Sequence, residues 1–71
     1  MQLKTDLRGG ELTVYGADWC GWTKKQRRYL DQAGIPYTYV NCDSQECPSF
    51  VSSFPTLVRD GRVMVGFQEL K

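Results

Sequence analysis

The 71-residue chain contains no histidine and only three cysteines. A zinc site built from cysteine and histidine needs four such ligands, so zinc here would require a carboxylate or an external ligand. We therefore predict no metal site. Because three is an odd number, at least one thiol stays unpaired within the chain, which argues against the disulfide framework of a small secreted protein.

The sequence also lacks a strong charge of either sign and a long hydrophobic run. Its nine basic and eight acidic residues give a formal net charge of +1, whereas nucleic-acid binding needs a basic excess. No apolar segment approaches the ~20 residues that span a bilayer, and residues 1–10 lack the apolar stretch of a signal peptide. We predict a single cytoplasmic domain over residues 1–71 that binds neither nucleic acid nor membranes.

The sequence does contain the pattern of a small α/β domain. Alternating apolar and polar residues predict a strand at 11–15. Residues 21–33 predict a helix that Gly34 terminates. The stripe expected to face the core has one polar member and comprises Trp22, Gln26, Tyr29, Leu30 and Ala33. The basic residues of the helix fall mainly on its other faces, where we expect solvent: Lys24, Lys25, Arg27 and Arg28.

A second strand is predicted at 37–42. Because it follows the first strand after a helix, the two should be parallel and joined by a right-handed crossover. The segment 43–53 then offers caps and breakers, and one or two helical turns are the most that it can hold. A capping-box pattern at Asp43 and Glu46 indicates where such a turn would begin.

The clearest local signal lies in the last third of the chain. Two apolar runs flank Asp60–Gly61, a pairing that favours a tight two-residue turn, and they predict a β-hairpin. Residues 67–71 follow as a short terminal helix. The predicted fold class is therefore α/β, in the order β-α-β, then β-β and a short helix, with the long helix on one face of a mixed four-stranded sheet.

Cys20 lies where the first strand gives way to the helix. The free N–H groups and the positive dipole at a helix N-terminus stabilise a thiolate, which lowers the pKa of a cysteine and makes it a nucleophile toward disulfides. A free cysteine is otherwise a small buried apolar residue. The polar neighbours Asp18 and Thr23, and a tryptophan on either side, favour the reactive interpretation.

The segment "ADWCGWTKK" resembles the active-site segment of the thioredoxin family, where Trp-Cys-Gly-Pro-Cys-Lys opens the first helix. "SSFPT", residues 52–56, resembles the loop in which that fold carries a cis-proline beside the active cysteine. "GIPYTYVN", "VGFQEL" and the compact length are more similar to glutaredoxins. The resemblance covers about residues 11–70 and implies a thioredoxin/glutaredoxin-like fold with cis Pro55. It also implies that the Phe54 backbone hydrogen-bonds a disulfide substrate.

The chain departs from the pattern of these families at several positions. Thr23 replaces the second cysteine, so a dithiol cycle within the motif is excluded and Cys20 is left as a single thiol. Val14 stands where thioredoxins have a buried aspartate. Ala17 stands where glutaredoxins usually have a lysine that binds glutathione, and Gly66 is what remains of their double glycine. The glutathione site is therefore incomplete.

Three arrangements are open for Cys42 and Cys47. They form a disulfide with each other that stiffens a short loop, or one of them resolves disulfides formed at Cys20, or Cys42 is buried and Cys47 is free. Cys42 follows a strand parallel to the first and should emerge at the same sheet edge as Cys20. The local disulfide resembles a pattern in the thioredoxin-like domain fused to some bacterial vitamin K epoxide reductase homologues, whereas a cytoplasmic location favours reduced thiols.

The interpretation that we favour is a small thiol–disulfide oxidoreductase that acts on mixed disulfides of proteins or of glutathione. The residues expected to act in catalysis are Cys20 as the nucleophile, Thr23 as a donor to its thiolate and Pro55 in substrate alignment. The residues expected to contact the substrate are Trp19, Gly21, Trp22, Phe54 and Gly66. We expect a monomer that requires no cofactor, with glutathione as a candidate co-substrate.

Two other classes of protein are alternatives. Monothiol glutaredoxins commonly bridge an iron–sulfur cluster between two subunits, using the active-site cysteine and glutathione, although the incomplete glutathione site argues against this role here. The other alternative is a redox-inert thioredoxin-fold module that binds a partner protein through its exposed apolar surface. The fold alone does not decide between them, because one fold hosts many functions.

Overall fold

The structure, a computed structural model, describes residues 11–70. The expectation that residues 1–10 contain no signal peptide lies outside the described residues. The expectation of one domain over residues 1–71 lies outside them at both ends of the chain. Five elements follow one another along the chain: β1 (Leu12–Gly16), α1 (Gly21–Ala33), β2 (Thr38–Asn41), β3 (Thr56–Arg59) and β4 (Arg62–Val65). Within residues 11–70 no helix is long and apolar enough to cross a bilayer.

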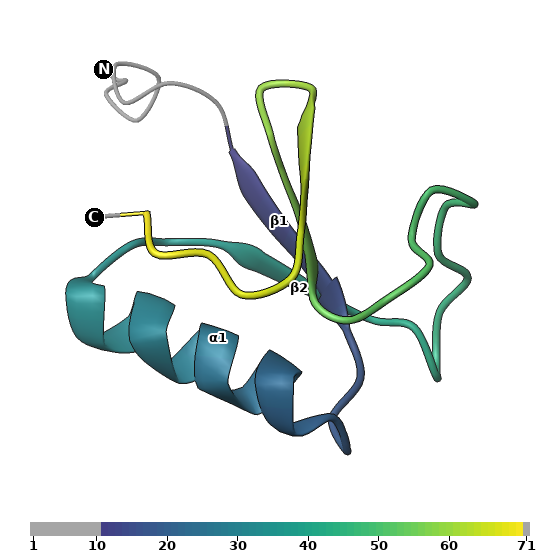
Figure 1. Cartoon of the computed structure of the whole chain (residues 1–71), viewed down its shortest axis with the longest axis horizontal. Helices are drawn as coiled ribbons and strands as arrows, with labels where there is room; N and C mark the ends of the chain where they lie inside the picture. Colours follow the sequence, from purple (N-terminus) through teal and green to yellow (C-terminus); the bar gives the residue numbers. More distant parts are fainter. Residues whose placement is uncertain (1–10, 71) are drawn as a thin grey trace.

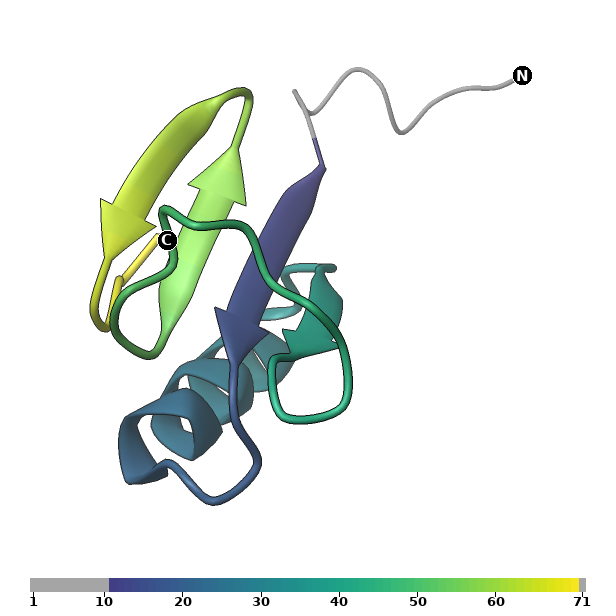
Figure 2. The same ribbon diagram turned by 90° about the vertical axis from the view of Figure 1, so that its right-hand side faces the viewer.

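The four strands form one mixed sheet in the order β2-β1-β3-β4. β1 and β2 are parallel, whereas β3 is antiparallel to both β1 and β4. Figure 1 shows α1 lying along one face of this sheet. In Figure 2 the segment that joins β2 to β3 crosses in front of β1. Phe50 of this segment meets Tyr15 of β1 edge-on, with ring centroids 5.9 Å apart. The architecture is the mixed four-stranded α/β sheet that the sequence predicts.

The core lies between α1 and the sheet. It consists of four apolar side chains that are at most 2% exposed: Leu12, Val14, Leu30 and Leu57. The helix buries Thr23, Gln26 and Leu30, which lie on one face of a helix with 3.6 residues per turn. The prediction that Trp22 lies in the core stripe is wrong, because Trp22 is 57% exposed. The buried position in the first turn of α1 belongs to Thr23, which packs against the end of β1 at Gly16.

Gln26, the polar member of the predicted stripe, is fully buried and fully paired. Its Nε2 donates to the carbonyl oxygen of Gln68 at 2.9 Å, and its Oε1 accepts the N–H of Gln68 at 2.6 Å. These bonds tie the segment after β4 to α1. The short terminal helix predicted at 67–71 is not found over 67–70, because the Gln68 backbone groups are paired with the Gln26 side chain instead.

The predicted helix boundary and hairpin are confirmed by their backbone angles. Gly34 ends α1 in the left-handed conformation, with φ 73°, and its N–H bonds to carbonyls of the last turn. Asp60 and Gly61 both have positive φ, 53° and 77°, as a two-residue turn whose twist matches its flanking strands requires.

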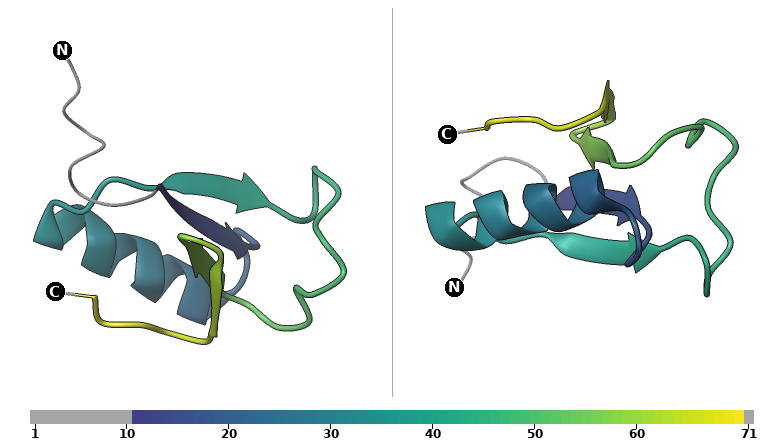
Figure 3. Two further views of the ribbon diagram at one scale, coloured as in Figure 1. Left: turned by 90° about the horizontal axis from the view of Figure 1, so that it is seen from above. Right: turned by 60° about the horizontal axis from the view of Figure 1, so that its bottom comes forward.

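The short helix predicted within 43–53 is absent from the structure. The N–H groups of Ser44 and Gln45 donate to the carbonyl of Asn41, which forms a tight turn after β2. The predicted cap also has another partner, because the carboxylate of Asp43 accepts a hydrogen bond from the Trp19 indole. This long-range contact and a disulfide take the place of local helical bonds. Figure 3 shows that the segment lies at the end of the sheet where α1 begins.

Candidate functional site

Cys20 is the N-cap residue of α1 and the free cysteine of the described chain. Its backbone is extended, with φ −83° and ψ 123°. Its N–H donates to the Ala17 carbonyl at 3.0 Å, and its carbonyl accepts the N–H of Lys24 at 3.1 Å. The side chain is half-buried. The structure thus places Cys20 at the positive end of the helix, as the sequence predicts.

The surroundings of Cys20 favour its thiolate. The backbone N–H of Thr23 contributes most to lowering the pKa of Cys20 below its ordinary value of 9.0, partial burial opposes the shift, and the Thr23 hydroxyl and the Trp22 N–H add to it. The Cys20 side chain makes no capping hydrogen bond to α1. The Thr23 and Trp22 donors lower the pKa because they stabilise negative charge on the sulfur. A lower pKa means a larger fraction of thiolate at neutral pH.

Thr23, three residues after Cys20, is fully buried. Its Oγ1 accepts the N–H of Ala17 at 3.4 Å, so the hydroxyl hydrogen remains available to the Cys20 sulfur. A Cβ on Gly16 would lie 2.5 Å from Thr23 Oγ1 and 2.6 Å from its Cγ2. Gly16 therefore allows Thr23 to pack against the end of β1. This contact has no local signal in the sequence.

Two exposed tryptophans flank Cys20 and point toward different segments. Trp19 is 66% exposed; its Nε1 donates to Asp43 Oδ2 at 2.6 Å, and its ring meets that of Phe54 edge-on at 6.0 Å. The Trp22 ring lies 6.3 Å from that of Phe67 on the segment after β4. The ammonium of Lys25 lies 5.0 Å from the centroids of both of these rings. Aromatic surface therefore borders the thiol on two sides.

The proline loop leads directly into β3. The Phe54–Pro55 peptide bond is cis, the isomer that the family resemblance implies. Pro55 is buried and its carbonyl accepts the N–H of Gly66 at 2.8 Å, which links the loop to the residue after β4. Gly66 has φ 90°. Within residues 11–70 no backbone hydrogen bond involves Phe54.

Cys42 and Cys47 form a disulfide, with their Cα atoms 5.5 Å apart. This is the first of the three arrangements that the sequence leaves open, and the arrangement with a buried Cys42 and a free Cys47 is not found. The N–H of Cys42 donates to the carbonyl of Gly16 at 2.8 Å. Cys42 therefore lies just after β2 and beside the carboxyl end of β1, from which the chain leads to Cys20.

A polar cluster beside the site was missed from sequence. Asp18 accepts hydrogen bonds from the Tyr39 hydroxyl at 2.8 Å and from Asn41 Nδ2 at 3.2 Å. The Arg27 guanidinium lies 3.9 Å from the Tyr39 ring centroid and 3.8 Å from Asp18 Oδ1, and its Nε donates to the Tyr37 hydroxyl. Arg27 keeps 40% of its side chain exposed, so it lies at the surface as expected, but it is paired there with Asp18 and Tyr37. Burial, followed by the bond to Asp18, raises the pKa of Tyr39 to about 12.

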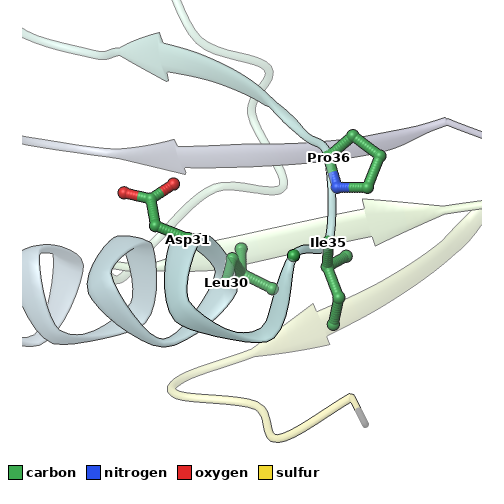
Figure 4. A pocket seen from close by; sticks show the side chains of 5 residues that line it. Leu30, Asp31, Ile35 and Pro36 are labelled. Atoms are coloured by element: carbon green, nitrogen blue, oxygen red, sulfur yellow. The ribbon is translucent and has the colours of Figure 1, made fainter.

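Other places in the described chain offer less chemistry. Gly21 opens α1 and has free space around its Cα. No three His, Cys, Asp or Glu side chains among residues 11–70 come together as metal ligands. A shallow hollow is found at the C-terminal end of α1, the end away from Cys20, and Figure 4 shows the side chains that line it: Leu30, Asp31, Ile35 and Pro36, beside Gly34.

Comparison with known proteins gives a consistent result. The Glutaredoxin family model matches residues 12–64. The crystal structure of the glutaredoxin from Methanosarcina mazei Go1 is similar, with a TM-score of 0.71 and 28% identity over 83% of this chain and 70% of that chain. A glutaredoxin from Archaeoglobus fulgidus shares the fold, with a TM-score of 0.69 and 19% identity over 94% of this chain and 87% of that chain. Among curated proteins none matches.

Proposed function

The chain belongs to the glutaredoxin family of thiol–disulfide oxidoreductases, and we propose that it acts through a single active-site thiol, Cys20, on mixed disulfides of proteins or of glutathione. The observation that carries this proposal is the position of Cys20 at the N-terminus of α1, where backbone and hydroxyl donors lower its pKa. The thiolate is the form that attacks a disulfide.

The first step forms one disulfide and breaks another. The Cys20 thiolate attacks one sulfur of the substrate, a disulfide joins Cys20 to that half, and the other half leaves as a thiolate that takes a proton from solvent. Thr23 stabilises the attacking thiolate through its N–H and its hydroxyl. An external thiol such as glutathione then attacks the Cys20–substrate disulfide and restores Cys20. This chemistry requires no metal and no resident cofactor.

Several features support alignment of an extended substrate beside Cys20. The Phe54 backbone has no hydrogen-bond partner within residues 11–70, so its N–H and carbonyl are free to pair with a substrate backbone. The Pro55 carbonyl accepts the N–H of Gly66 at 2.8 Å, which holds this loop against the residue after β4. Trp19 and Trp22 supply an apolar rim, while Gly21 adds no side chain that would block the approach to the sulfur.

The test uses the native protein with its disulfide intact, because Cys20 is then the free thiol. The rate of Cys20 alkylation by iodoacetamide is measured against pH, with Cys20→Ser as the control for reaction elsewhere. We expect a midpoint below the value of the urea-unfolded chain, and a glutathione adduct on Cys20 when the native protein meets glutathione disulfide. An unshifted midpoint together with no adduct would overturn the proposal and favour a redox-inert module that binds a partner protein.

A further inference from the structure

The Cys42–Cys47 disulfide is anchored to the chain segment that carries Cys20. The Cys42 N–H bonds to the Gly16 carbonyl at 2.8 Å, at the point where β1 leads into the turn before Cys20. One residue further on, Asp43 accepts the indole N–H of Trp19 at 2.6 Å. Figures 1 and 3 show the β2–β3 connection at the end of the sheet where α1 begins. The disulfide and the free thiol thus belong to one end of the molecule.

Trp19, the residue before Cys20, contacts both ends of the segment that carries Cys47. Its indole nitrogen meets Asp43 at the start of this segment, and its ring meets Phe54 at the end, with centroids 6.0 Å apart. The intervening chain therefore leaves the vicinity of Trp19 and returns to it. Cys47 lies in this loop, between the two residues that contact Trp19, Asp43 and Phe54.

The two halves of the loop differ in how firmly they are held. Asn41 holds the first half, because its carbonyl accepts the N–H groups of Ser44 and Gln45 and its Oδ1 accepts the N–H of Asp43. In residues 46–52 the backbone–backbone bonds reduce to a single local one, from Val51 to Pro48. A segment with few hydrogen bonds opens at low free-energy cost. Once the disulfide is reduced, Cys42 stays at the strand end, whereas Cys47 is free to move.

We propose that Cys42 and Cys47, when reduced, form a second redox pair that resolves the mixed disulfide at Cys20, in place of the cysteine that Thr23 replaces. This proposal rests on the proposed function of Cys20. The disulfide seen in the structure is then the state reached at the end of one turnover. Cys42 and Cys47 are both only partly buried, and reduction of their disulfide by a small dithiol or a dithiol protein returns the pair to its active state.

The electrons and protons balance over two exchanges. The Cys47 thiolate attacks the Cys20 sulfur of the Cys20–substrate disulfide, and the second half of the substrate leaves as a thiolate. The Cys42 thiolate then attacks the Cys47 sulfur of the Cys20–Cys47 disulfide, so that Cys42–Cys47 forms and Cys20 leaves as a thiolate. The substrate disulfide gains two electrons and becomes two thiols, whose protons come through solvent from the oxidised pair.

The main experiment compares one protein in two redox states. The native chain with its disulfide, and the same chain reduced with dithiothreitol and then freed of it, each react with one equivalent of glutathione disulfide. Released glutathione is measured, and the products are identified by mass spectrometry. The oxidised chain should release about one glutathione per protein and keep a stable adduct on Cys20, whereas the reduced chain should release about two and end with Cys42–Cys47 and no adduct.

Single substitutions test the order of attack. Cys47→Ser should keep the glutathione adduct on Cys20, because the attacking thiol is gone. Cys42→Ser should release the second glutathione and trap a Cys20–Cys47 disulfide. In the reduced Cys20→Ser chain, oxidation of Cys42 and Cys47 should be at least tenfold slower than in the wild-type chain. Circular dichroism of each variant shows whether it keeps the native fold.

The outcomes separate the two proposals. If the reduced wild-type chain accumulates the Cys20 adduct while Cys42 and Cys47 remain thiols, the relay is wrong and the function of Cys20 stands. Equal oxidation rates of the pair with and without Cys20 would also overturn the relay. If no adduct forms on Cys20 in any state or variant, the proposed function itself fails.

Discussion

Replacing Gly16 by alanine would place a methyl carbon 2.5 Å from Oγ1, 2.6 Å from Cγ2 and 3.1 Å from Cβ of Thr23. All three atoms belong to a side chain that is 0% exposed. Thr23 is β-branched and stiff at χ1, and rotating it away would break the bond that its Oγ1 accepts from the Ala17 N–H. The collision therefore has to be relieved by a shift of α1 relative to the end of β1.

Inserting a methyl group into a filled site typically costs ~1–3 kcal/mol. We expect Gly16→Ala to lower the free energy of unfolding by about 2 kcal/mol, because two contacts fall below 3.0 Å on a side chain with no free space. For a domain of this size, that loss lowers Tm by about 8–16 °C. Because the Thr23 donors would be displaced from Cys20, alkylation of Cys20 at neutral pH should also slow.

The matched control is Gly21→Ala, in the first turn of the same helix. A Cβ at Gly21 meets nothing within 4 Å, and alanine in place of glycine stabilises a helix by roughly 0.5–1 kcal/mol. Thermal and urea unfolding of both variants is followed by circular dichroism with the disulfide kept oxidised. Combining Gly16→Ala with Thr23→Ala removes two of the three colliding atoms and should show a favourable coupling of about 1 kcal/mol.

A free energy of unfolding of Gly16→Ala within about 0.5 kcal/mol of the wild-type value, the range of ordinary surface substitutions, would show that Gly16 and Thr23 are not tightly packed. Gly21→Ala as the more damaging change would show the same, because the two glycines differ mainly in what lies next to the added carbon.

Three further changes test the site and its supports. Thr23→Val keeps the shape of the side chain but removes the hydroxyl, so the midpoint of Cys20 alkylation should move to higher pH. In the wild type, the lowered pKa of Cys20 should add stability as pH rises through its folded value, and this gain should be complete above the unfolded value near 9.0. Gln26→Met leaves the Gln68 backbone without its two partners and should destabilise by ~1–3 kcal/mol in urea unfolding. In absorbance titration at alkaline pH, Tyr39 should stay protonated between 10.0 and about 12, and Tyr39→Phe should abolish this late step. The stability that this group contributes is fully present below 10.0 and is lost as pH rises from 10.0 through about 12. A single midpoint for all four tyrosines of the wild type would contradict this.

The elements that could be predicted from sequence are those fixed by neighbouring residues. The helix ends at Gly34 because glycine adopts positive φ without strain. The hairpin turns at Asp60–Gly61 because aspartate tolerates the left-handed conformation and glycine adopts it freely. Cys20 was placed correctly because its position depends only on where a strand stops and a helix starts. Each of these signals lies within a few residues of its effect.

The incorrect predictions share a different cause. The capping-box pattern at Asp43 is a genuine local signal, but the Trp19 indole, 24 positions away, uses that carboxylate. The terminal helix is absent because Gln26, 42 positions away, pairs with the backbone of Gln68. The cluster around Asp18 likewise combines a turn, a helix and a strand. Spacing in one sequence carries no information on which distant side chain takes a local partner.

The burial of position 23 bears on why a second redox pair would lie in the loop. Thr23 is 0% exposed and fills the space beside Gly16, so a sulfur at this position would be screened from an external reductant. Cys42 and Cys47 are half-buried at the edge of the sheet, within a loop that has few backbone bonds. A pair placed there lies in the loop that Trp19 contacts at Asp43 and Phe54, while position 23 retains its roles in packing and in stabilising the Cys20 thiolate.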